Sequence, residues 1–394
     1  MKPYGPYLIR ACHVDSAWRQ ANEVILEKGI PVTTEDKKQE TIETIGCIIH
    51  LTDWRGGPIL PRGYIGMDEA NLKENYIPQY LTAERGAHTY TYGWCARKRF
   101  GVNQVEKAKE NLKGGDVAII QFWNPASDIL NPNPPCISMI VLHRMGDTVH
   151  AVAYLRSNDM ARAWPEDVAG INMTFLTEVA SHFKGIDSIG TTTTISASAH
   201  IYKTAEEELR KALSQTLPPT ARKHRHTGRE VAGGPVIIEA ATISEAAEKA
   251  RAAAEKYARQ GNLYIALKIL KPEDCEPDKE VIGKLENYQG TTDQGEEKTV
   301  NQIQYATQKV ATTPQSRRIL VTPCNPKTSQ HANPLLIQFL PRQGENHAIA
   351  LYANTKLSKL PEETAKAATI HKQVSKKAHM KPGPLTIIIT PLKK

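Results

Sequence analysis

Residues 131–202 carry a thiol, a guanidinium group, hydroxyls and carboxylates at the ends of expected strands. Cys136 follows two prolines, which disfavour a helix, and precedes an alternating apolar run, so it should open a strand. A second strand is expected over residues 150–155, directly before the run Arg156, Ser157, Asn158 and Asp159. A third, expected over residues 193–198, leads to His200 and Tyr202. Strand ends are rigid, so these side chains could form one site.

The residue types in this set suit covalent chemistry on an anionic substrate. A cysteine thiolate is a strong nucleophile, and a neighbouring guanidinium group favours the thiolate. The same guanidinium group can bind phosphate through its rigid fork of donors. A single cysteine is nevertheless most often a small apolar filler of the core. The order and spacing of the whole set therefore carry the argument.

That order resembles the thymidylate synthase and deoxycytidylate hydroxymethylase family, above all its short archaeal members. The shared segments are Pro-Pro-Cys136, Tyr-Leu-Arg156-Ser-Asn-Asp159, a Pro-x-Asp turn ending at Asp167, and Ser-Ala-His200-Ile-Tyr202. Upstream, the resemblance continues through residues 90–97, 102–105 and 123–125. It covers residues 85–203 well and the first eighty residues only loosely.

The resemblance implies a role for each matched residue. Cys136 would add to C6 of a pyrimidine, which makes C5 nucleophilic. Arg156 would bind the nucleotide phosphate and lower the pKa of the thiol. The other matched residues would hold the ligands: Ser157 at the phosphate, His200 and Tyr202 at the sugar hydroxyl, Asp159 at the folate, and Tyr92, Trp94, Trp123 and Asn124 as candidate further contacts.

The family also places a phosphate-binding arginine loop and a base-activating glutamate in the first eighty residues. Residues 54–66, rich in Gly and Pro, are expected to be loop. The candidates for the two roles are Arg55, Arg62, Glu69 and Glu74. An alternative alignment puts Leu60 in the place of the glutamate, which leaves the general acid unassigned.

The turn that ends at Asp167 indicates the substrate. In the synthases this turn reads Pro-x-Asn, and the amide pairs with uracil; here it reads Pro165-Glu166-Asp167. An aspartate accepts from the cytosine 4-amino group but opposes uracil O4 with a second acceptor, at a cost of roughly 1–3 kcal/mol. The hydroxymethylating relatives carry aspartate at this place. We therefore expect a cytidylate substrate; a shift of one residue would put Glu166 at the base instead.

The second part of the chain repeats the pattern of the first. Five segments recur in order: residues 5–29 at 234–261, 102–105 at 300–303, 124–125 at 325–326, 133–155 at 333–352, and 164–166 at 360–362. In the second copy Pro334 or Leu335 replaces the thiol, and Tyr352-Ala353 replaces Arg156-Ser157. The second copy should therefore have no chemistry of its own.

The second copy also carries an arginine pair that the first copy lacks. In the family, a Ser-Arg-Arg sequence before a strand reaches the nucleotide phosphate of the dimer partner. The first copy has Lys-Gly-Gly-Asp at residues 113–116, whereas the second has Ser316-Arg317-Arg318 before an expected strand at 319–322. We expect a gene duplication in which one chain folds as a pseudo-dimer with a single composite site. Arg317 and Arg318 would bind the phosphate there.

The expected fold class is α+β: a thymidylate synthase-like mixed sheet with flanking helices, in two tandem copies that form an intramolecular pseudo-dimer. Residues 1–225 would be the catalytic domain, and residues 226–394 a degenerate domain without the nucleophile that supplies the arginine pair. A basic linker is expected over residues 218–234, and a polar surface excursion over residues 271–299. The remaining expected elements are a strand at 7–11, a helix at 15–28 capped by Asp15 or Ser16 and stopped by Gly29, a strand at 45–51, helices at 103–112 and 170–183, and a strand at 117–122.

Composition is consistent with this interpretation without deciding it. The 394 residues have a formal charge of +8 and a pI near 9.0, which suits nucleotides and polyglutamylated folates as well as nucleic acid. No Cys-x-x-Cys pair occurs, so neither a disulfide framework nor a metal site is expected. No run of about eighteen apolar residues occurs either. We expect a cytoplasmic protein without a membrane partner.

The predicted activity is transfer of a one-carbon unit to C5 of a pyrimidine nucleoside monophosphate. The donor would be 5,10-methylenetetrahydrofolate or methylenetetrahydromethanopterin, and the first-ranked product is 5-hydroxymethyl-cytidylate. The alternatives are thymidylate synthase proper, acting on dUMP, and a pseudoenzyme that binds nucleotide or RNA. We expect a monomer. Its expected partners are the pyrimidine nucleotide and the reduced pterin, and nucleic acid is not an expected partner.

Overall fold

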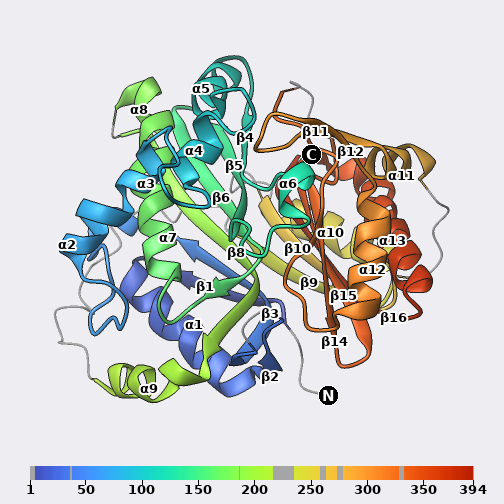
Figure 1. Cartoon of the computed structure of the whole chain (residues 1–394), viewed down its shortest axis with the longest axis horizontal. Coiled ribbons are helices and arrows are strands. Elements are labelled where there is room, and N and C mark those ends of the chain that lie inside the picture. The colour runs from blue at the N-terminus through green and yellow to red at the C-terminus, as the bar shows by residue number, and fades with distance from the viewer. Residues whose placement is uncertain are drawn as a thin grey trace.

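Two mixed β-sheets pack face to face, and helices cover the outer face of each (Figure 1). The computed structural model describes residues 5–35, 38–185, 187–215, 235–257, 263–272, 278–327 and 332–393. The two mixed sheets with flanking helices confirm the predicted α+β class. The predicted linker, 218–234, lies outside the described residues.

The first sheet is built from strands of residues 7–202. Its order is β1-β3-β8-β6-β5-β4, with β2 beside β3 and β7 beside β8. The strands are β1 (Tyr7–Ala11), β2 (Ile30–Thr33), β3 (Glu40–Leu51), β4 (Val117–Gln121), β5 (Ile137–Met145), β6 (Thr148–Leu155), β7 (Asn158–Asp159) and β8 (Ile189–Tyr202). The helices are α1 (Val14–Lys28), η1 (Trp54–Gly56), α2 (Glu69–Asn71), η2 (Leu72–Tyr76), α3 (Pro78–Leu81), α4 (Tyr92–Arg97), α5 (Gln104–Gly114), α6 (Pro125–Asp128), α7 (Trp164–Gly170), η3 (Ile171–Leu176), α8 (Thr177–Lys184), η4 (Lys203–Ala205) and α9 (Glu206–Ser214).

The second sheet has the order β9-β10-β16-β15-β14-β13. Its strands are β9 (Val236–Ala240), β10 (Leu263–Ile269), β13 (Ile319–Val321), β14 (Leu336–Arg342), β15 (Glu345–Lys356) and β16 (Lys381–Lys393). A separate hairpin is formed by β11 (Tyr288–Thr291) and β12 (Glu297–Val300). The helices are α10 (Ile243–Tyr257), α11 (Lys279–Glu286), α12 (Gln302–Thr312), η7 (Leu357–Lys359) and α13 (Leu360–Lys377).

The two sheets have the same strand order and the same strand directions. In the first sheet β1 and β3 are parallel, β3 and β8 antiparallel, β8 and β6 parallel, and β6-β5 and β5-β4 antiparallel. The series β9-β10-β16-β15-β14-β13 repeats these directions pair by pair.

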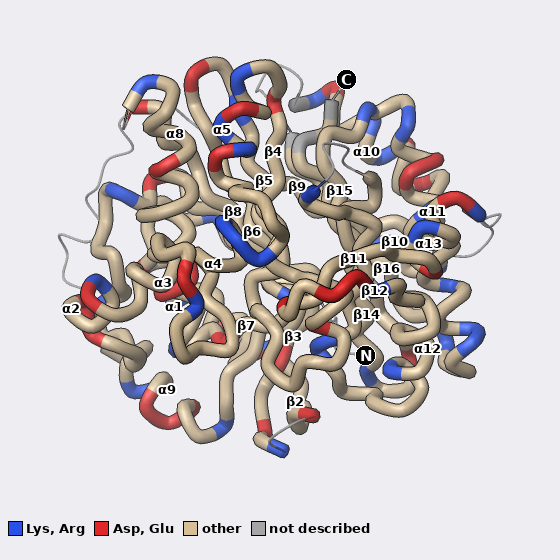
Figure 2. The backbone as a smooth tube through the Cα atoms, turned by 45° about the horizontal axis from the view of Figure 1, so that its top comes forward, with Lys and Arg blue, Asp and Glu red and all other residues tan. Residues whose placement is uncertain are grey.

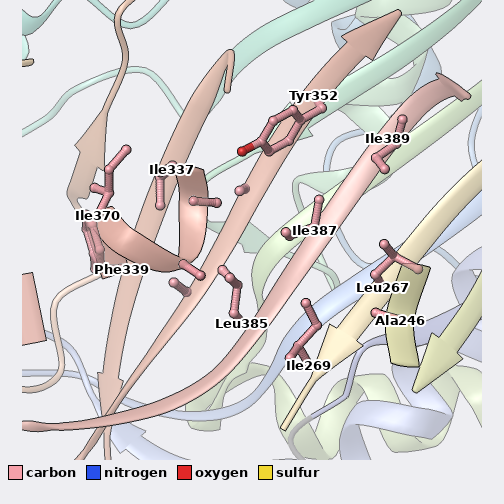
Figure 3. Close-up of a cluster of buried hydrophobic side chains, with 14 of the residues drawn as sticks. Ala246, Leu267, Ile269, Ile337, Phe339, Tyr352, Ile370, Leu385, Ile387 and Ile389 are labelled. Atoms are coloured by element: carbon pink, nitrogen blue, oxygen red, sulfur yellow. The ribbon is translucent and has the colours of Figure 1, made fainter. Parts of the chain in front are cut away.

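Each sheet has one helix-covered face and one face against the other sheet. Apolar side chains of both sheets form a single buried cluster between them, among them Ile48, Tyr154, Leu351 and Ile388. The outer face of the second sheet packs on α10, α12 and α13 through the cluster in Figure 3, which includes Phe339 and Ile387. Burial of apolar surface on both faces of each sheet is the main stabilising contribution.

A kink at Gly46 turns the end of β3 toward the second sheet. Side chains two apart on a strand normally share a face. Here Ile45 belongs to the cluster between the sheets, whereas Cys47 packs on the α1 side. Gly46, with φ +74°, lies between them in a conformation that side chains rarely adopt. The kink therefore presents Glu43 to the second sheet.

The buried carboxylate of Glu43 joins the two halves of the chain. It accepts from Arg342 through Nε at 2.6 Å and Nη2 at 3.0 Å, and from Arg317 Nε at 3.1 Å; the Ser198 hydroxyl donates to it as well. Burial would raise the pKa of Glu43, but the two arginines outweigh burial and hold this pKa well below its usual value. Most other charged residues lie on the outer helices and turns (Figure 2).

The boundaries of several elements differ from expectation. The strand at 7–11 is confirmed, but the side chains of Asp15 and Ser16 do not cap α1, which begins after His13. Asp15 instead accepts from the backbone and side chain of Arg62. The third expected strand is longer, 189–202, and the expected helix at 170–183 begins at Trp164 and includes a π-helical turn.

The expected surface excursion at 271–299 is wrong for its hairpin. Asp293, between β11 and β12, accepts from the buried Arg99 at 2.8 and 2.9 Å, and Arg99 also pairs with Asp128 at 2.6 Å. The Asn124 amide donates to the Thr291 carbonyl at 2.9 Å. The segment is polar because it docks on the first half through buried ion pairs and hydrogen bonds, and a polar composition alone does not distinguish such docking from exposure.

Replacing Glu43 by glutamine should destabilise the protein strongly. Two buried guanidinium groups would lose their counter-ion, which costs about 3–5 kcal/mol when one partner of a buried pair is removed. The matched control is Glu69→Gln, which removes an exposed carboxylate paired with Lys73 and should change little. Denaturant unfolding measures both variants; equal effects would contradict the role assigned to Glu43.

Candidate functional site

Cys136 stands directly before β5, next to Arg156 at the end of β6. The Arg156 backbone N–H donates to the Cys136 carbonyl at 2.9 Å, and Arg156 Nη2 lies 3.9 Å from Cys136 Sγ. The guanidinium group is buried and also donates to the carbonyls of Pro134 and Pro135 at 2.6 and 2.8 Å. The Pro-Pro-Cys turn is thus the platform on which Arg156 rests, and the two predicted residues are brought together.

The pKa of Cys136 moves opposite to the expected direction. Burial raises it, Arg156 lowers it, and Asp167 raises it again; Arg318 and Arg317 lower it further, and the net pKa lies above the usual value of a thiol. The cationic influence that the sequence indicated is present, but desolvation of the thiol outweighs it.

One amide of the second half connects Arg156 with Arg317. Gln338 Nε2 donates to the Arg156 carbonyl at 2.9 Å and to the Arg317 carbonyl at 3.1 Å. Its Oε1 accepts from the Tyr154 hydroxyl at 3.0 Å. Arg156 Nη1 itself lies 3.5 Å from the Arg317 carbonyl. The backbone of the arginine pair is therefore adjacent to the residue expected to bind phosphate.

The side chain of Arg317 lies against the strands that carry His200 and Tyr202. It donates to Thr41 Oγ1 at 2.6 Å as well as to Glu43. Thr41 pairs with Tyr202 across β3 and β8, and Glu43 pairs with His200. The two rings meet edge to face at 5.1 Å. Burial, then the charge of Arg317, lowers the pKa of His200, so the imidazole is neutral near pH 7.

Asp167 lies on α7, where two tyrosine hydroxyls hold it. Tyr76 and Tyr80 each donate to Oδ1 at 2.9 Å. Burial raises the pKa of Asp167 to about 7, although both hydrogen bonds oppose this shift. Glu166 accepts instead from the Tyr64 hydroxyl at 2.7 Å and the Met67 N–H at 3.3 Å. Since Asp167 raises the pKa of Cys136, it is the acid on the thiol side.

Asp159 and Ser157 follow Arg156 on the same turn. Asp159 Oδ1 accepts the N–H groups of Ala161 at 3.0 Å and Arg162 at 3.3 Å. Burial raises the pKa of Asp159 to about 6, so the group is charged at pH 7. Ser157 is buried.

Some predicted residues have contacts of another kind. Glu69 pairs with Lys73, Glu74 is exposed, and Arg62 pairs with Asp15 at 2.9 Å. Trp123 packs between the sheets, and Asn124 caps α6 through the Ala126 N–H. These contacts do not involve Cys136, whereas the Tyr92 hydroxyl accepts the N–H of Ile137, the residue after Cys136, at 3.4 Å. Trp94 packs under Arg85 and Arg99.

Sequence reasoning missed Tyr76, Tyr80, Glu43, Gln338 and Arg342. The tyrosines are four residues apart in a short helical segment, a spacing that puts both on one face. That spacing was the available signal for the pair. For Glu43, Gln338 and Arg342 the signal would have been a charged or amide residue inside an otherwise apolar strand.

A further cavity is lined by residues other than Cys136 and its contacts. It has a volume of about 380 Å³, opens at the start of β8, away from His200 at the end of that strand, and its lining includes Arg55, one of the candidates for the phosphate loop. Within the described ranges, no group of three His, Cys, Asp or Glu side chains could hold a metal ion. No described helix has the length and apolar character needed to cross a membrane.

Comparisons with known proteins identify the family of the chain. The family model described as thymidylate synthase matches residues 69–229. A "Putative thymidylate synthase" of Methanothermobacter thermautotrophicus is 28% identical over an aligned length of 224, which covers 52% of this chain and 99% of the relative. That of Methanopyrus kandleri is 30% identical over 52% of this chain and 95% of its own length. Each relative is thus about half as long as this chain, and the chain belongs to the thymidylate synthase family of one-carbon transferases.

Proposed function

We propose that the protein transfers a one-carbon unit to C5 of a cytidine monophosphate, ribo or deoxyribo, and forms its 5-hydroxymethyl derivative. The observation that carries this proposal is the grouping of the Cys136 thiol, the Arg156 guanidinium group 3.9 Å from it, and the buried Asp167, whose charge acts on the same thiol. The family supplies the reaction class, and Asp167 supplies the choice of base.

The chain's own groups account for the covalent step. The Cys136 sulfur would attack C6, and the electron pair of the C5–C6 bond would make C5 the nucleophile. Arg156 favours the thiolate and anchors the phosphate, which fixes C6 over the sulfur. C5 would bond to the one-carbon unit, and loss of the C5 proton with departure of the carrier would leave an exocyclic methylene on the nucleotide. Water would then add to the methylene carbon and give up a proton, while the C6–S bond breaks, restores the C5–C6 double bond and returns the Cys136 thiolate. His200, being neutral, can hydrogen-bond the sugar hydroxyl without a charge.

We infer that a reduced pterin binds next to Asp159. When bound, such a cofactor supplies the one-carbon unit as a methylene group. Asp159 is charged at pH 7, and its Oδ1 is occupied by two backbone N–H groups. Its second oxygen would accept from the pterin ring. Methylenetetrahydrofolate and methylenetetrahydromethanopterin share the ring donors that this contact needs.

The arginine pair of the second half would complete the phosphate site. Support comes from the repeated topology and from one repeated device. Gln104 exchanges two hydrogen bonds with the backbone of Gln121, at 2.9 and 2.8 Å, and Gln302 does the same with Thr322, at 2.8 and 2.9 Å. We therefore infer a duplication, with residues 1–225 catalytic and residues 226–394 a degenerate copy that makes the chain a monomeric pseudo-dimer.

A second candidate is thymidylate synthase proper, acting on dUMP. The observation that favours it is the pKa of Asp167, about 7, because a protonated carboxyl group can donate to uracil O4. A nucleotide- or RNA-binding pseudoenzyme is the third candidate, favoured by the exposure of Glu69 and Glu74. Tritium release from C5-labelled dCMP and dUMP, with methylenetetrahydrofolate, separates the three.

Replacing Cys136 by alanine should abolish tritium release while leaving nucleotide affinity within about tenfold, because the thiol acts on the reacting carbon and not on recognition. Cys12, the other half-buried cysteine among those described, provides the control variant Cys12→Ala, which should remain active. Release at a tenth of the wild-type rate in Cys136→Ala would remove the thiol from the mechanism.

Replacing Asp167 by asparagine should shift the preference from the cytosine to the uracil nucleotide, since the amide can donate to O4. The ratio of the two kcat/KM values, taken at about pH 9, measures the change. At that pH Asp167 is ionised with or without the charge of Glu166, so Glu166→Gln, which alters the contact with Tyr64, serves as the control. An unchanged ratio in Asp167→Asn would mean that another residue reads the base.

Replacing both Arg317 and Arg318 by alanine should weaken nucleotide binding on the order of a hundredfold or more and leave nucleoside binding nearly unchanged, because the only ligand contacts that it removes are those to the phosphate. Arg342 still neutralises Glu43 in this variant, which favours retention of the fold. Calorimetry with dCMP and deoxycytidine gives both affinities, and Arg210→Ala, on the surface of α9, is the control. Equal losses for the two ligands would refute the phosphate role.

A further inference from the structure

We propose that Tyr76 and Tyr80 are specificity-determining positioning residues, which decide whether residue 167 offers an acceptor or a donor to the pyrimidine. This inference rests on the proposed function, because it concerns the same base-reading position. It assigns that function's choice of base to three side chains instead of one.

Tyr76 and Tyr80 share one acceptor atom on Asp167. Tyr76, at the end of η2, and Tyr80, on α3, donate to the same oxygen, Oδ1 of Asp167, both at 2.9 Å. Their hydroxyl oxygens lie 3.3 Å apart. Burial raises the pKa of both phenols well above the usual value, so both remain protonated donors. Two donors thus converge on one side of the carboxyl group.

The other oxygen of the Asp167 carboxyl group, Oδ2, is the atom that a ligand would meet. A carboxylate has about four acceptor positions on two oxygens, and two of those on Oδ1 are used. Across the described part of the chain, no side chain or N–H group donates to Oδ2. A ligand at residue 167 would therefore meet Oδ2, an acceptor that matches the 4-amino group of cytosine.

The two tyrosines would also fix the orientation of an asparagine side chain at position 167. Two O–H donors require an acceptor opposite them, so an asparagine at this position would turn its carbonyl oxygen to the tyrosines. Its NH2 group would then face the ligand as a donor for uracil O4. The tyrosine pair thereby links the identity of residue 167 to the hydrogen-bonding character of the site, and without the pair the amide could take either orientation.

The protonation state of Asp167 also depends on the two tyrosines. Burial and the charge of Glu166 raise the pKa of Asp167 to about 7, and the two tyrosine hydrogen bonds lower it. The other titratable groups that the charge of Asp167 affects are Cys136 and the phenols of Tyr64, Tyr90 and Tyr92, whose pKa values it raises. Loss of the tyrosine hydroxyls should raise the pKa of Asp167 further. The protonated acid is a donor, so the preference for cytosine should be present above this pKa and lost as pH falls through it.

The test measures Kd for dCMP and dUMP by calorimetry from about pH 6 to about pH 9, a range that spans the shifted pKa. The wild-type protein should prefer dCMP at the upper end and lose this preference near pH 7. In the Tyr76→Phe/Tyr80→Phe variant the midpoint should move up by about one pH unit, and at neutral pH the dCMP-to-dUMP affinity ratio should fall by about tenfold. Tyr352→Phe, which removes a buried hydroxyl that donates to the Glu363 carbonyl in the second half, should leave the ratio and the midpoint unchanged.

Two further variants keep the proposal open to refutation if the double variant does not fold. Tyr76→Phe alone should move the midpoint in the same direction by a smaller amount. In the Asp167→Asn background, Tyr76→Phe should reduce the preference for dUMP. Wild-type ratios and midpoints in all the tyrosine variants would overturn the role of the pair while leaving the proposed function intact. Failure of the wild-type protein to bind either nucleotide would overturn both.

Discussion

A carboxylate without exposed surface, that of Glu43, has to be neutralised, and both of its guanidinium partners come from the other half of the chain. An unpaired charge at this depth would cost several kcal/mol, so the two sheets can pack only in the register that brings Arg317 and Arg342 to it. The same register puts the Arg317 backbone beside Arg156 and its side chain beside the strands of His200. The geometry of the candidate site is thus a consequence of one buried charge.

The two sheets differ in chemistry although they share a topology. The first sheet carries the thiol turn, the Arg156 turn and the His-x-Tyr strand, each at a strand end. The second presents Gln338, Arg317 and Arg342 across the apolar cluster and has Leu335, fully buried, at the place of the thiol. At this place the second sheet therefore contributes apolar packing, whereas the first carries a thiol.

Sequence reasoning reached the family, the α+β class and the strands around Cys136 because these depend on local patterns: Pro-Pro before a strand, alternation within it, and motifs at its end. It also pointed to Arg317 through the repeat, and that role remains a prediction. It did not reach Glu43 or Tyr80, since their partners are 274 and 87 residues away. The pKa of Cys136 was misjudged for a related reason: neighbouring charges can be read from a motif, whereas desolvation depends on the whole fold.

The contact between the sheets lies within one polypeptide. Two separate subunits with the same face would associate with an affinity that depends on their concentration, and dilution would take them apart. Here the partner face is tethered, so its effective concentration is set by the connecting chain and not by the amount of protein. Arg99 of the first half also pairs with Asp293 of the second half at 2.8 Å, which adds an ion pair between the two halves. A tethered interface can tolerate substitutions that would dissociate a two-chain assembly. The second sheet is therefore freer to diverge in sequence than a subunit that must bind its partner from solution.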